Sequence, residues 1–368
     1  MSGQLQVGVV GAAGRGHSYF VPFQVNPHTE LVALCDLNAE GLRRVAAEVG
    51  VDRTYTDCEA MLDEGGVDVL VIGTPMPLHA PQAIMALERG VHVLSEVPAA
   101  VSMDECVALV EAARSSAAQY MMAENYCYLR TNVLVREMAH AGLFGELYFG
   151  EGEYVHELKE LNEITRWRRT WQTGISGCTY PTHSLGPLLQ WFRQRVVSVC
   201  CFGCGHHYTD PRGDRYENED STFMACRLER GGLANVRLDM LSDRPHNLTY
   251  YSLQGTRGCY EAPRGFGDDH KVWLADRAGG GLEWRALRDF EQEFLPQHWL
   301  HPPEEALQAG HWGGDYWQVA DFVEAIVNDT NPPIGLHEAL DMTIPGLVSQ
   351  RSIAQGAVWL PVPDSREW

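Results

Sequence analysis

The first 126 residues alternate short apolar runs with stretches that suit helices. Residues 5–10 (LQVGVV), 31–35, 67–72 and 91–94 are mostly apolar and rich in β-branched residues, which is typical of strands buried on both faces. Helices are expected up to about residue 90 and over about 102–117. This alternation predicts a doubly wound, Rossmann-type parallel sheet, in which ligands lie at the carboxyl ends of the strands.

A glycine-rich turn follows the first of these strands directly. Its sequence is Gly-Ala-Ala-Gly-Arg-Gly, and a helix-compatible stretch comes next. Glycine tolerates positive φ and lets the backbone approach a pyrophosphate, while a helix N-terminus supplies N–H groups. We therefore expect this turn to bind a dinucleotide through Gly11, Ala13, Gly14, Arg15 and Gly16.

An acidic residue, Asp36, ends the second predicted strand, twenty residues after Gly16. A carboxylate at this place holds a ribose 2′-hydroxyl in dinucleotide-binding proteins. Leu37 follows it, so no neighbouring cation would accept a 2′-phosphate, and NAD is favoured over NADP. The alternative is that Asp36 only caps a helix. Polar residues at later strand ends, namely Thr74, Pro75, Glu96 and Asn125, extend the predicted cofactor site.

The remaining residues, 127–368, are long enough for a second domain, since domains average roughly 100–200 residues. A strand is expected over 147–155 and an amphipathic helix over 319–326. Residues 260–310, rich in Gly, Pro, Trp and charge, read as a loop or partial insertion. Tyr180 and His183 are three residues apart, as on one helix face, with Pro181 in the first helical turn.

Histidine and tyrosine at these positions could exchange protons with a substrate hydroxyl. Histidine has an unperturbed pKa near neutral pH and is the usual general base. His156, at the end of the 147–155 strand, could be a second acid or base beside His183 and Tyr180. The alternative is that His183 is a hydrogen-bonded structural histidine in the interior.

Taken together, the chain resembles the Gfo/Idh/MocA family of sugar oxidoreductases. The resemblance rests on the glycine turn, Asp36, the segment from Thr74-Pro75 to His79, Glu96-Val97-Pro98 and Gly142–Glu146. The segments 121–128, 150–158 and 180–187 look like the branch of NAD-dependent glycosidases that includes α-N-acetylgalactosaminidases. Two positions depart from the family: Val97 stands where a lysine is usual, and Thr179 where an aspartate is common.

The resemblance implies a C-terminal α/β domain with a large, mostly antiparallel sheet, and a homo-oligomer, either a dimer or a tetramer. It adds His79 to the cofactor residues. With the aromatic and charged residues near the predicted base, it implies sugar contacts for Tyr126, Glu153, Arg166, Trp171 and His311. The implied reaction is glycoside cleavage by transient oxidation, at ring carbon 3, with elimination, hydration and re-reduction. Alternatives are an ordinary NAD-dependent sugar or cyclitol dehydrogenase, or a catalytically decayed NAD- or ligand-binding protein.

A divalent metal is a further possibility, with His156, Cys178, His183 and His206 as candidate ligands. Separately, Cys200, Cys201 and Cys204 precede His206 and His207, which resembles half of a zinc site, but no second Cys-x-x-Cys pair completes it. Packing at a strand end is the other explanation of this cluster.

Charge and apolar pattern exclude some partners. The formal net charge of -21 disfavours nucleic acid and anionic membrane surfaces. No apolar run reaches the roughly 20 residues of a membrane span, and the N-terminal residues lack the pattern of a signal peptide. The scattered cysteines favour free thiols and a cytoplasmic location.

Overall fold

The computed structural model of the chain describes residues 3–245, 248–265, 267–279 and 281–368. They form two compact units. Unit 1 comprises Met1–Tyr128, Pro303–Leu340 and Ser365–Trp368, and unit 2 comprises Leu129–Pro302 and Asp341–Asp364. The sequence-based division into 1–126 and 127–368 differs from this grouping, because residues 303–340 and 365–368 pack with the N-terminal part.

Unit 1 is built on a parallel sheet of six strands in the order β3-β2-β1-β4-β5-β6 among the described residues. The strands are β1 Leu5–Val10, β2 Thr29–Cys35, β3 Arg53–Tyr55, β4 Val69–Ile72, β5 His92–Ser95 and β6 Tyr120–Met122. The order reverses between β1 and β4, as in dinucleotide-binding folds. The predicted Rossmann sheet is thus confirmed, and β3, whose three residues are polar or partly exposed, was not predicted.

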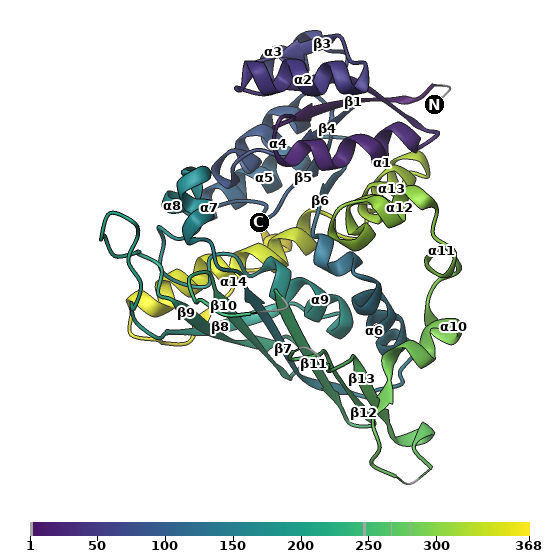
Figure 1. Ribbon diagram of the computed structural model, residues 1–368, viewed down its shortest axis with the longest axis vertical. Coiled ribbons are helices and arrows are strands. Elements are labelled where there is room, and N and C mark those ends of the chain that lie inside the picture. Colours follow the sequence, from purple (N-terminus) through teal and green to yellow (C-terminus); the bar gives the residue numbers. More distant parts are fainter. Residues whose placement is uncertain (1–2, 246–247, 266, 280) are drawn as a thin grey trace. The chain divides into compact units, whose positions relative to one another are not determined.

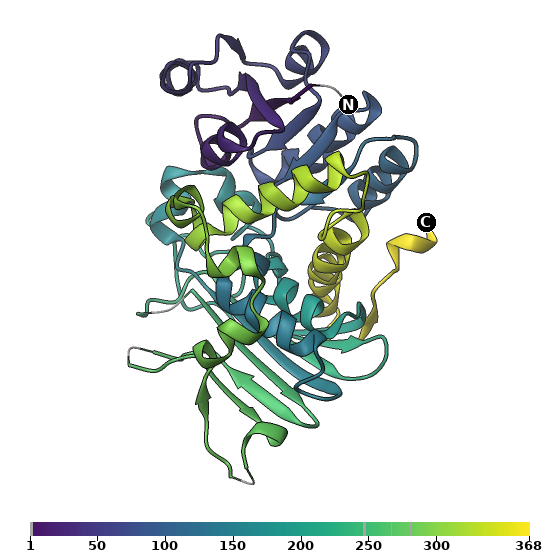
Figure 2. The ribbon, with the colours of Figure 1, turned by 90° about the vertical axis from the view of Figure 1, so that its right-hand side faces the viewer.

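The helices of unit 1 cover this sheet on both faces. They are η1 Arg15–Tyr19, α1 Phe20–Val25, α2 Ala39–Val49, α3 Cys58–Glu64, η2 Met76–Leu78, α4 His79–Glu88, α5 Met103–Arg114, η3 Asn125–Tyr128, α12 Glu304–Gln308, η6 His311–Gly313, α13 Gly314–Val327 and η7 Ser365–Glu367. Figures 1 and 2 show α4 and α5 on one side of the strands and α1 and α13 on the other. Helix α13 packs on α1 and η3, which explains why this late segment belongs to unit 1.

Unit 2 contains a sheet of nine strands in the order β14-β13-β12-β11-β7-β10-β9-β8-β15. The strands are β7 Leu147–Val155, β8 Val196–Gly203, β9 Ser221–Leu228, β10 Leu233–Asp239, β11 Thr249–Gly255, β12 Gly258–Glu261, β13 Lys271–Leu274, β14 Arg285–Ala286 and β15 Leu360–Pro361. Of the strand pairs described in this sheet, only β7–β10 is parallel. The expected large, mostly antiparallel sheet, and with it the α/β class, is confirmed.

Helix α9 (Thr182–Phe192) lies on one face of this sheet, with α6 (Arg130–His140) beside it (Figures 1 and 2). A side chain at Gly152 of β7 would stand 2.2 Å from the carbonyl oxygen of Ser184. Glycine therefore allows the strand and the helix to approach closely at this point. The same close contact fixes where the first turn of α9 lies over β7.

The long segment 260–310 contains more regular structure than the loop that its composition suggested. Besides β12, β13 and β14 it holds η4 Ala275–Arg277, η5 Leu287–Phe290, α10 Glu291–Phe294, α11 Gln297–Leu300 and the start of α12. These elements are only two to five residues long, which explains why no periodic pattern revealed them.

The remaining helices are α7 Lys159–Ile164, α8 Trp167–Trp171 and α14 Leu336–Ala354. No described helix has both the length and the apolar composition that a membrane span needs.

Candidate active site

The glycine-rich turn between β1 and η1 has the backbone that a pyrophosphate site requires. Gly11 has φ +76, and a side chain there would stand 2.5 Å from the carbonyl oxygen of Gly73. A side chain at Gly16 would stand 2.8 Å from the Gly11 oxygen, whereas one at Gly14 would meet nothing nearer than 3.6 Å. The turn is thus tightly packed on its protein side and open above Gly14, which suits the approach of a dinucleotide.

Asp36 lies beside this turn at the end of β2, as predicted. Its Oδ2 accepts a hydrogen bond of 2.9 Å from the backbone N of Ala13, and its Oδ1 accepts one of 2.8 Å from the N of Asn38. The carboxylate is not the cap of the following helix, whose N-cap residue is Asn38. Instead, it fixes the middle of the glycine turn. Leu37 beside it is 85% exposed, so no cation stands at the adjacent position.

Arg15 of the turn is held by two carboxylates from distant parts of unit 1. Its Nε lies 2.6 Å from Oε1 of Glu96, and its Nη1 and Nη2 lie 2.7 and 2.8 Å from the two oxygens of Asp315. The hydroxyl of Tyr19 also donates to Glu96. We refer to Arg15, Tyr19, Glu96, His311, Asp315 and Gln318 as the Arg15 network. The sequence predicts that Arg15 and Glu96 contact the cofactor. The structure shows that they form an ion pair with each other, and their contact with the cofactor stays a prediction.

Both carboxylates of the Arg15 network are held in their charged form. Burial raises the pKa of Glu96, but the charge of Arg15 and the hydroxyl of Tyr19 lower it more, so the net shift is downward. In the same way, burial raises the pKa of Asp315, and its bonds to Arg15 and His311 bring it well below its ordinary value. The network is therefore an ion-paired cluster at neutral pH.

His311, predicted to touch substrate, belongs to this network. Its Nδ1 lies 3.1 and 3.0 Å from the two oxygens of Asp315, and its ring is 6.4 Å from that of Tyr126. His311, Trp312 and Gly313 all have positive φ, and the bond to Asp315 helps hold this strained turn. Tyr126 is buried, and burial raises the pKa of its hydroxyl. For both residues, a contact with substrate stays a prediction.

The other predicted cofactor residues lie at strand ends of unit 1. The hydroxyl of Thr74 bonds to Oε1 of Gln82 at 2.7 Å, and Pro75 caps η2. The ring nitrogens of His79 lie 2.9 and 2.8 Å from the carbonyl oxygens of Pro98 and Thr74. His79 therefore connects two strand-end turns, and its direct contact with a cofactor stays a prediction.

Asn125 gives an independent sign that a ligand belongs at these strand ends. The residue is 2% exposed, and its side-chain Oδ1 has no hydrogen-bond partner among the described residues. Buried polar atoms normally have partners, so an orphaned acceptor points to a missing donor. With the open turn at Gly14, this acceptor fits a dinucleotide held along the carboxyl edge of the sheet.

Four aromatic side chains gather in unit 2 where β7 ends and α9 begins. We refer to Tyr154, His156, Tyr180 and His183 as the His183 cluster. The ring of His183 lies 4.9 Å from that of Tyr154 and 5.0 Å from that of Tyr180, both edge-on. The hydroxyl of Tyr154 bonds to Nδ1 of His156 at 2.8 Å. The structure thus brings together all three residues predicted as catalytic, and adds Tyr154 as their common neighbour.

The local structure at Tyr180 differs from the prediction. Helix α9 begins at Thr182, and Pro181 is its N-cap residue rather than part of its first turn. Tyr180 therefore lies just before the helix. It still meets His183, because the backbone of Pro181 is already near helical values, with φ -82 and ψ -14.

Glu153 does not join the cluster. Successive residues of a strand point to opposite faces, so Glu153 lies on the face of β7 away from Tyr154. There its Oε1 lies 2.7 Å from Nη1 of Arg264, and its Oε2 lies 3.8 Å from Nη1 of Arg237. The expectation that Glu153 contacts the same substrate as His183 is thus not supported by its position.

Two further predicted substrate residues lie around α8. Arg166 is the exposed N-cap residue of this helix, and Trp171 is its partly buried last residue. Their roles stay predictions.

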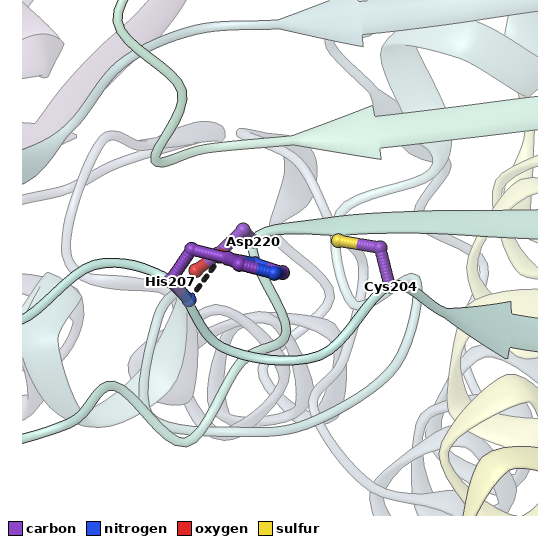
Figure 3. Close-up of side chains that lie close together, drawn as sticks. All are labelled: Cys204, His207 and Asp220. Carbon is purple, nitrogen blue, oxygen red and sulfur yellow. Dashed lines mark hydrogen bonds and ion pairs between the residues drawn. The ribbon is translucent and has the colours of Figure 1, made fainter.

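The four candidate metal ligands do not form one group in the structure. Among the described residues, the one group of three metal-ligating side chains that lie close together is Cys204, His207 and Asp220 (Figure 3). It contains none of His156, Cys178, His183 and His206. Cys178 is fully buried, and burial raises the pKa of its thiol well above the ordinary value, which disfavours metal binding there.

Three site residues, Tyr19, Asp220 and Asp315, were not predicted from the sequence. Tyr19 and Asp315 each follow a predicted residue, Arg15 and His311, by four positions, a spacing that brings helical side chains together. That spacing was the available signal for them. Asp220 gave no such signal, because the fold alone brings it to Cys204.

Two family models match the chain over most of its length. Residues 5–124 match the oxidoreductase family with an NAD-binding Rossmann fold (Gfo/Idh/MocA). Residues 206–367 match the C-terminal domain of glycosyl hydrolase family 109. The two matches together span the strand-end residues of unit 1 as far as Glu96 and the larger part of the unit 2 sheet, and Asn125 lies one residue beyond the first match.

Relatives match along nearly the whole chain. A glycosyl hydrolase family 109 protein of Saccharopolyspora erythraea is 28% identical over 98% of this chain and 83% of its own length. An α-N-acetylgalactosaminidase of Shewanella oneidensis is 27% identical, with 98% and 84% covered. Among solved structures, levoglucosan dehydrogenase with NADH and levoglucosan shares the fold, with a TM-score of 0.81, 21% identity, and 98% and 100% of the two chains covered.

The dinucleotide turn, the orphaned acceptor of Asn125 and the strand order agree with these matches. The predicted family is confirmed, and the predicted cofactor is supported by the NAD-binding domain. The chain therefore joins an NAD-binding Rossmann domain of the Gfo/Idh/MocA oxidoreductase type to a C-terminal domain of the glycosyl hydrolase 109 type.

Proposed function

We propose that the protein cleaves a glycosidic bond by transient oxidation of a sugar ring hydroxyl, at carbon 3, without net consumption of NAD. The observation that carries this proposal is the His183 cluster, because it places two histidines and two tyrosines in ring contact. A reaction that moves several protons on one sugar needs more than one acid or base. The glycosidase relatives support the same choice.

The residues that would hold NAD are those of unit 1 described above. The glycine turn would take the pyrophosphate, Asp36 the ribose, and the strand-end residues up to Asn125 the nicotinamide part. NAD supplies the acceptor for hydride and later returns it. The Arg15 network would keep the turn in its binding geometry, since Arg15 is part of that turn.

In the oxidation step, His183 or Tyr180 takes the proton of the ring hydroxyl while its carbon loses hydride. The ketone formed acidifies the neighbouring C–H bond. A second base, Tyr180 or His156, takes that proton, and the substituent at the anomeric carbon departs with a proton from an acid of the cluster. Water then adds at the anomeric carbon, the neighbouring carbon regains a proton, and reduction of the ketone completes hydrolysis. Atoms balance as glycoside plus water giving sugar plus alcohol.

The bond between Tyr154 and His156 gives the second base a defined role. For His156 to act as a base through Nε2, its Nδ1 must carry the ring proton and donate it to the Tyr154 oxygen. Tyr154 would then fix both the tautomer and the ring orientation of His156. We assign Tyr154 as a positioning residue for His156.

The absence of two usual family residues also favours this proposal over a dehydrogenase. Val97 and Thr179 stand where family dehydrogenases use a lysine and an aspartate. Both residues are buried, at 2% and 8% exposure, and neither side chain can act as an acid or base. Proton transfer would therefore depend on the His183 cluster.

The test is a panel of glycosides with purified protein, following free sugar and NADH absorbance in the same sample. Released sugar without accumulating NADH supports the proposal. NADH accumulating while the glycosidic bond stays intact would make the protein a sugar or cyclitol dehydrogenase. His183→Ala should lower turnover by roughly 10²–10⁴-fold, whereas His301→Gln, an exposed histidine of the same unit, should not.

We also propose a homo-oligomer, a dimer or a tetramer, formed through unit 2. Phe202 and Phe223 are directly paired across β8 and β9 and are 50% and 42% exposed, and exposed aromatic pairs are common at subunit interfaces. Light scattering of the purified protein tests this, and a monomer at micromolar concentration would contradict it.

The cysteines of the described chain are all free, which supports a reducing, cytoplasmic compartment.

A further inference from the structure

A group of three side chains outside the His183 cluster has the composition of a metal site. The ligand atoms of Cys204, His207 and Asp220 all lie within 4.8 Å of one another. Figure 3 shows the sulfur of Cys204 directed toward the side where His207 and Asp220 meet. We propose that these three residues bind one divalent ion of the zinc type, through a thiolate, an imidazole and a carboxylate.

The sheet itself brings the ligands together. Cys204 directly follows β8 and Asp220 directly precedes β9, and these two strands are antiparallel neighbours. The backbone N of Cys204 donates to the Ser221 oxygen at 3.1 Å, and the N of Asp220 to the Gly205 oxygen at 3.1 Å. The ladder thus continues past the strand ends and fixes two of the three ligands on rigid backbone.

Each ligand also has a partner that prepares it for an ion. The N–H of Ser221 donates to the sulfur of Cys204 at 3.2 Å, which orients the sulfur. Nδ1 of His207 lies 2.7 Å from Oδ2 of Asp220, so Nδ1 carries the proton and Nε2 keeps the free lone pair. Carboxylate bonds of this kind orient the histidines of metal sites.

The second, independent observation is an orphaned oxygen. Asp220 is only 3% exposed, and its Oδ1 has no hydrogen-bond partner among the described residues. A buried carboxylate without partners for both oxygens is costly unless a cation is near. No arginine or lysine pairs with Asp220 in the described ion pairs, and its recorded ion-pair partner is His207.

The three ligand atoms indicate which metal ion the site would prefer. One sulfur, one nitrogen and one oxygen ligand suit zinc, whereas calcium and magnesium prefer oxygen alone. A thiolate and a carboxylate together balance the charge of a divalent ion. Ligand atoms of tetrahedral zinc lie about 3.3–3.8 Å apart, so the exposed side chains of Cys204 and His207 need to move inward by about 1 Å. Water would complete the coordination.

An ion at this site would also stiffen the loop that links β8 to β9. Residue Asn218 of that loop donates from its backbone N to the Thr173 oxygen at 3.1 Å, and from its side chain to the oxygens of Ile175 and Gly177 at 3.0 and 3.2 Å. Those residues lead directly to Tyr180. The metal site would thereby brace the segment that carries one member of the His183 cluster, although the proposal does not depend on the glycosidase function.

The test uses the full-length protein, stripped with a chelator and titrated with zinc. We expect one zinc ion per chain by elemental analysis, and cobalt in its place should give a thiolate-to-cobalt absorption band. Cys204→Ala and His207→Ala, both at exposed positions, should weaken zinc binding at least about 100-fold and abolish or alter the cobalt band. The matched control is Cys259→Ala, which removes a partly buried thiol of β12 in the same unit and should bind zinc normally.

Hydrogen exchange gives a readout that needs no activity. Zinc should slow exchange across residues 205–219 in the unmodified protein and in Cys259→Ala, but not in His207→Ala. The proposal would be overturned by a stripped protein that binds no zinc, or by zinc binding and a cobalt band that survive Cys204→Ala.

Discussion

At the scale of single residues, unit 1 depends on charges that are buried and paired. Arg15 belongs to the glycine turn, and its guanidinium is shared by Glu96 and Asp315. A buried ion pair contributes little when complete, but removing one partner is costly because it leaves a desolvated charge. Single substitutions in the Arg15 network should therefore affect both stability and its dependence on pH.

Asp315→Asn should lower the free energy of unfolding at neutral pH by about 2–3 kcal/mol, since it removes a charged hydrogen-bond pair while Glu96 still holds Arg15. The pKa of Asp315 is lowered from 3.8 and that of Glu96 from 4.5. Protons therefore bind the unfolded chain more tightly. The stability that these groups contribute is complete above about pH 4.5 and is lost as pH falls through the folded-state pKa values.

Urea unfolding at neutral pH and at a pH below 3.8 measures both effects. The difference between the unmodified protein and Asp315→Asn should shrink at the lower pH. A variant that loses the same free energy at both pH values would contradict an ionised Asp315. Glu324→Gln changes an exposed acid of α13 and serves as the matched control, since its free energy of unfolding should stay close to that of the unmodified protein at both pH values.

Tyr154→Phe tests the positioning of His156. Removing the hydroxyl breaks its 2.8 Å bond to Nδ1 while keeping the ring beside His183. We expect kcat to fall by roughly tenfold or more and the free energy of unfolding to change by only about 1 kcal/mol. Tyr148→Phe, on the same strand and 49% exposed, is the control. Unchanged kcat in Tyr154→Phe, with an altered stability alone, would assign Tyr154 a structural role.

At the scale of elements, the sequence predicts most of the parallel sheet of unit 1. Continuous apolar runs predicted β1 with its observed bounds and β2, β4 and β5 within two residues, because a strand buried on both faces leaves such a run. In unit 2, β7 was predicted with its observed bounds, although its burial alternates along the strand. The same rule explains the omission of β3, which has no such run. It also explains why the short elements between residues 260 and 310 read as a loop.

The site was less predictable than the strands. Motif spacing identified the glycine turn, Asp36, Tyr180 and His183, since these residues lie close to each other or to a strand end. Asp315 and Asp220 reach their partners from far along the chain, so no local pattern connects them. Glu153 was assigned to the substrate by its neighbourhood in sequence, yet the alternation of a strand turns it to the other face.

The close contact between β7 and α9 positions the residues of the His183 cluster. Gly152→Ala would place a methyl group 2.2 Å from the Ser184 oxygen, and the helix would have to move. We expect a loss of about 1–3 kcal/mol in stability and a large loss of turnover, because His183 precedes Ser184. Gly150→Ala meets side-chain atoms rather than backbone, Phe192 at 2.9 Å and Leu188 at 3.2 Å, and should cost less. Equal effects of the two substitutions, measured by urea unfolding and turnover, would contradict the close contact.

At the scale of the whole molecule, the two compact units are interleaved in sequence. Unit 1 needs residues 303–340, because α13 supplies Asp315 to Arg15. A fragment of residues 1–128 should therefore lack cooperative thermal unfolding and bind NAD weakly, although it contains the complete parallel sheet. Cooperative unfolding of this fragment, with the NAD affinity of the full chain, would show that the late segment is dispensable.

The net charge of -21 disfavours a polymer of like charge as the substrate, which agrees with the small sugar substrate proposed above. The central claim is that the glycosidic bond breaks after oxidation and elimination, with no net redox change. Elimination removes the proton from the carbon next to the oxidised one, and hydration returns a proton from solvent.

The most direct measurement is hydrolysis of an accepted glycoside in D2O, with the released sugar analysed by NMR. We predict deuterium at carbon 2, retained protium at carbon 3, and no accumulation of NADH. Released sugar without deuterium at carbon 2 would mean that the bond was cleaved by direct displacement, and the account of the His183 cluster given above would then be wrong.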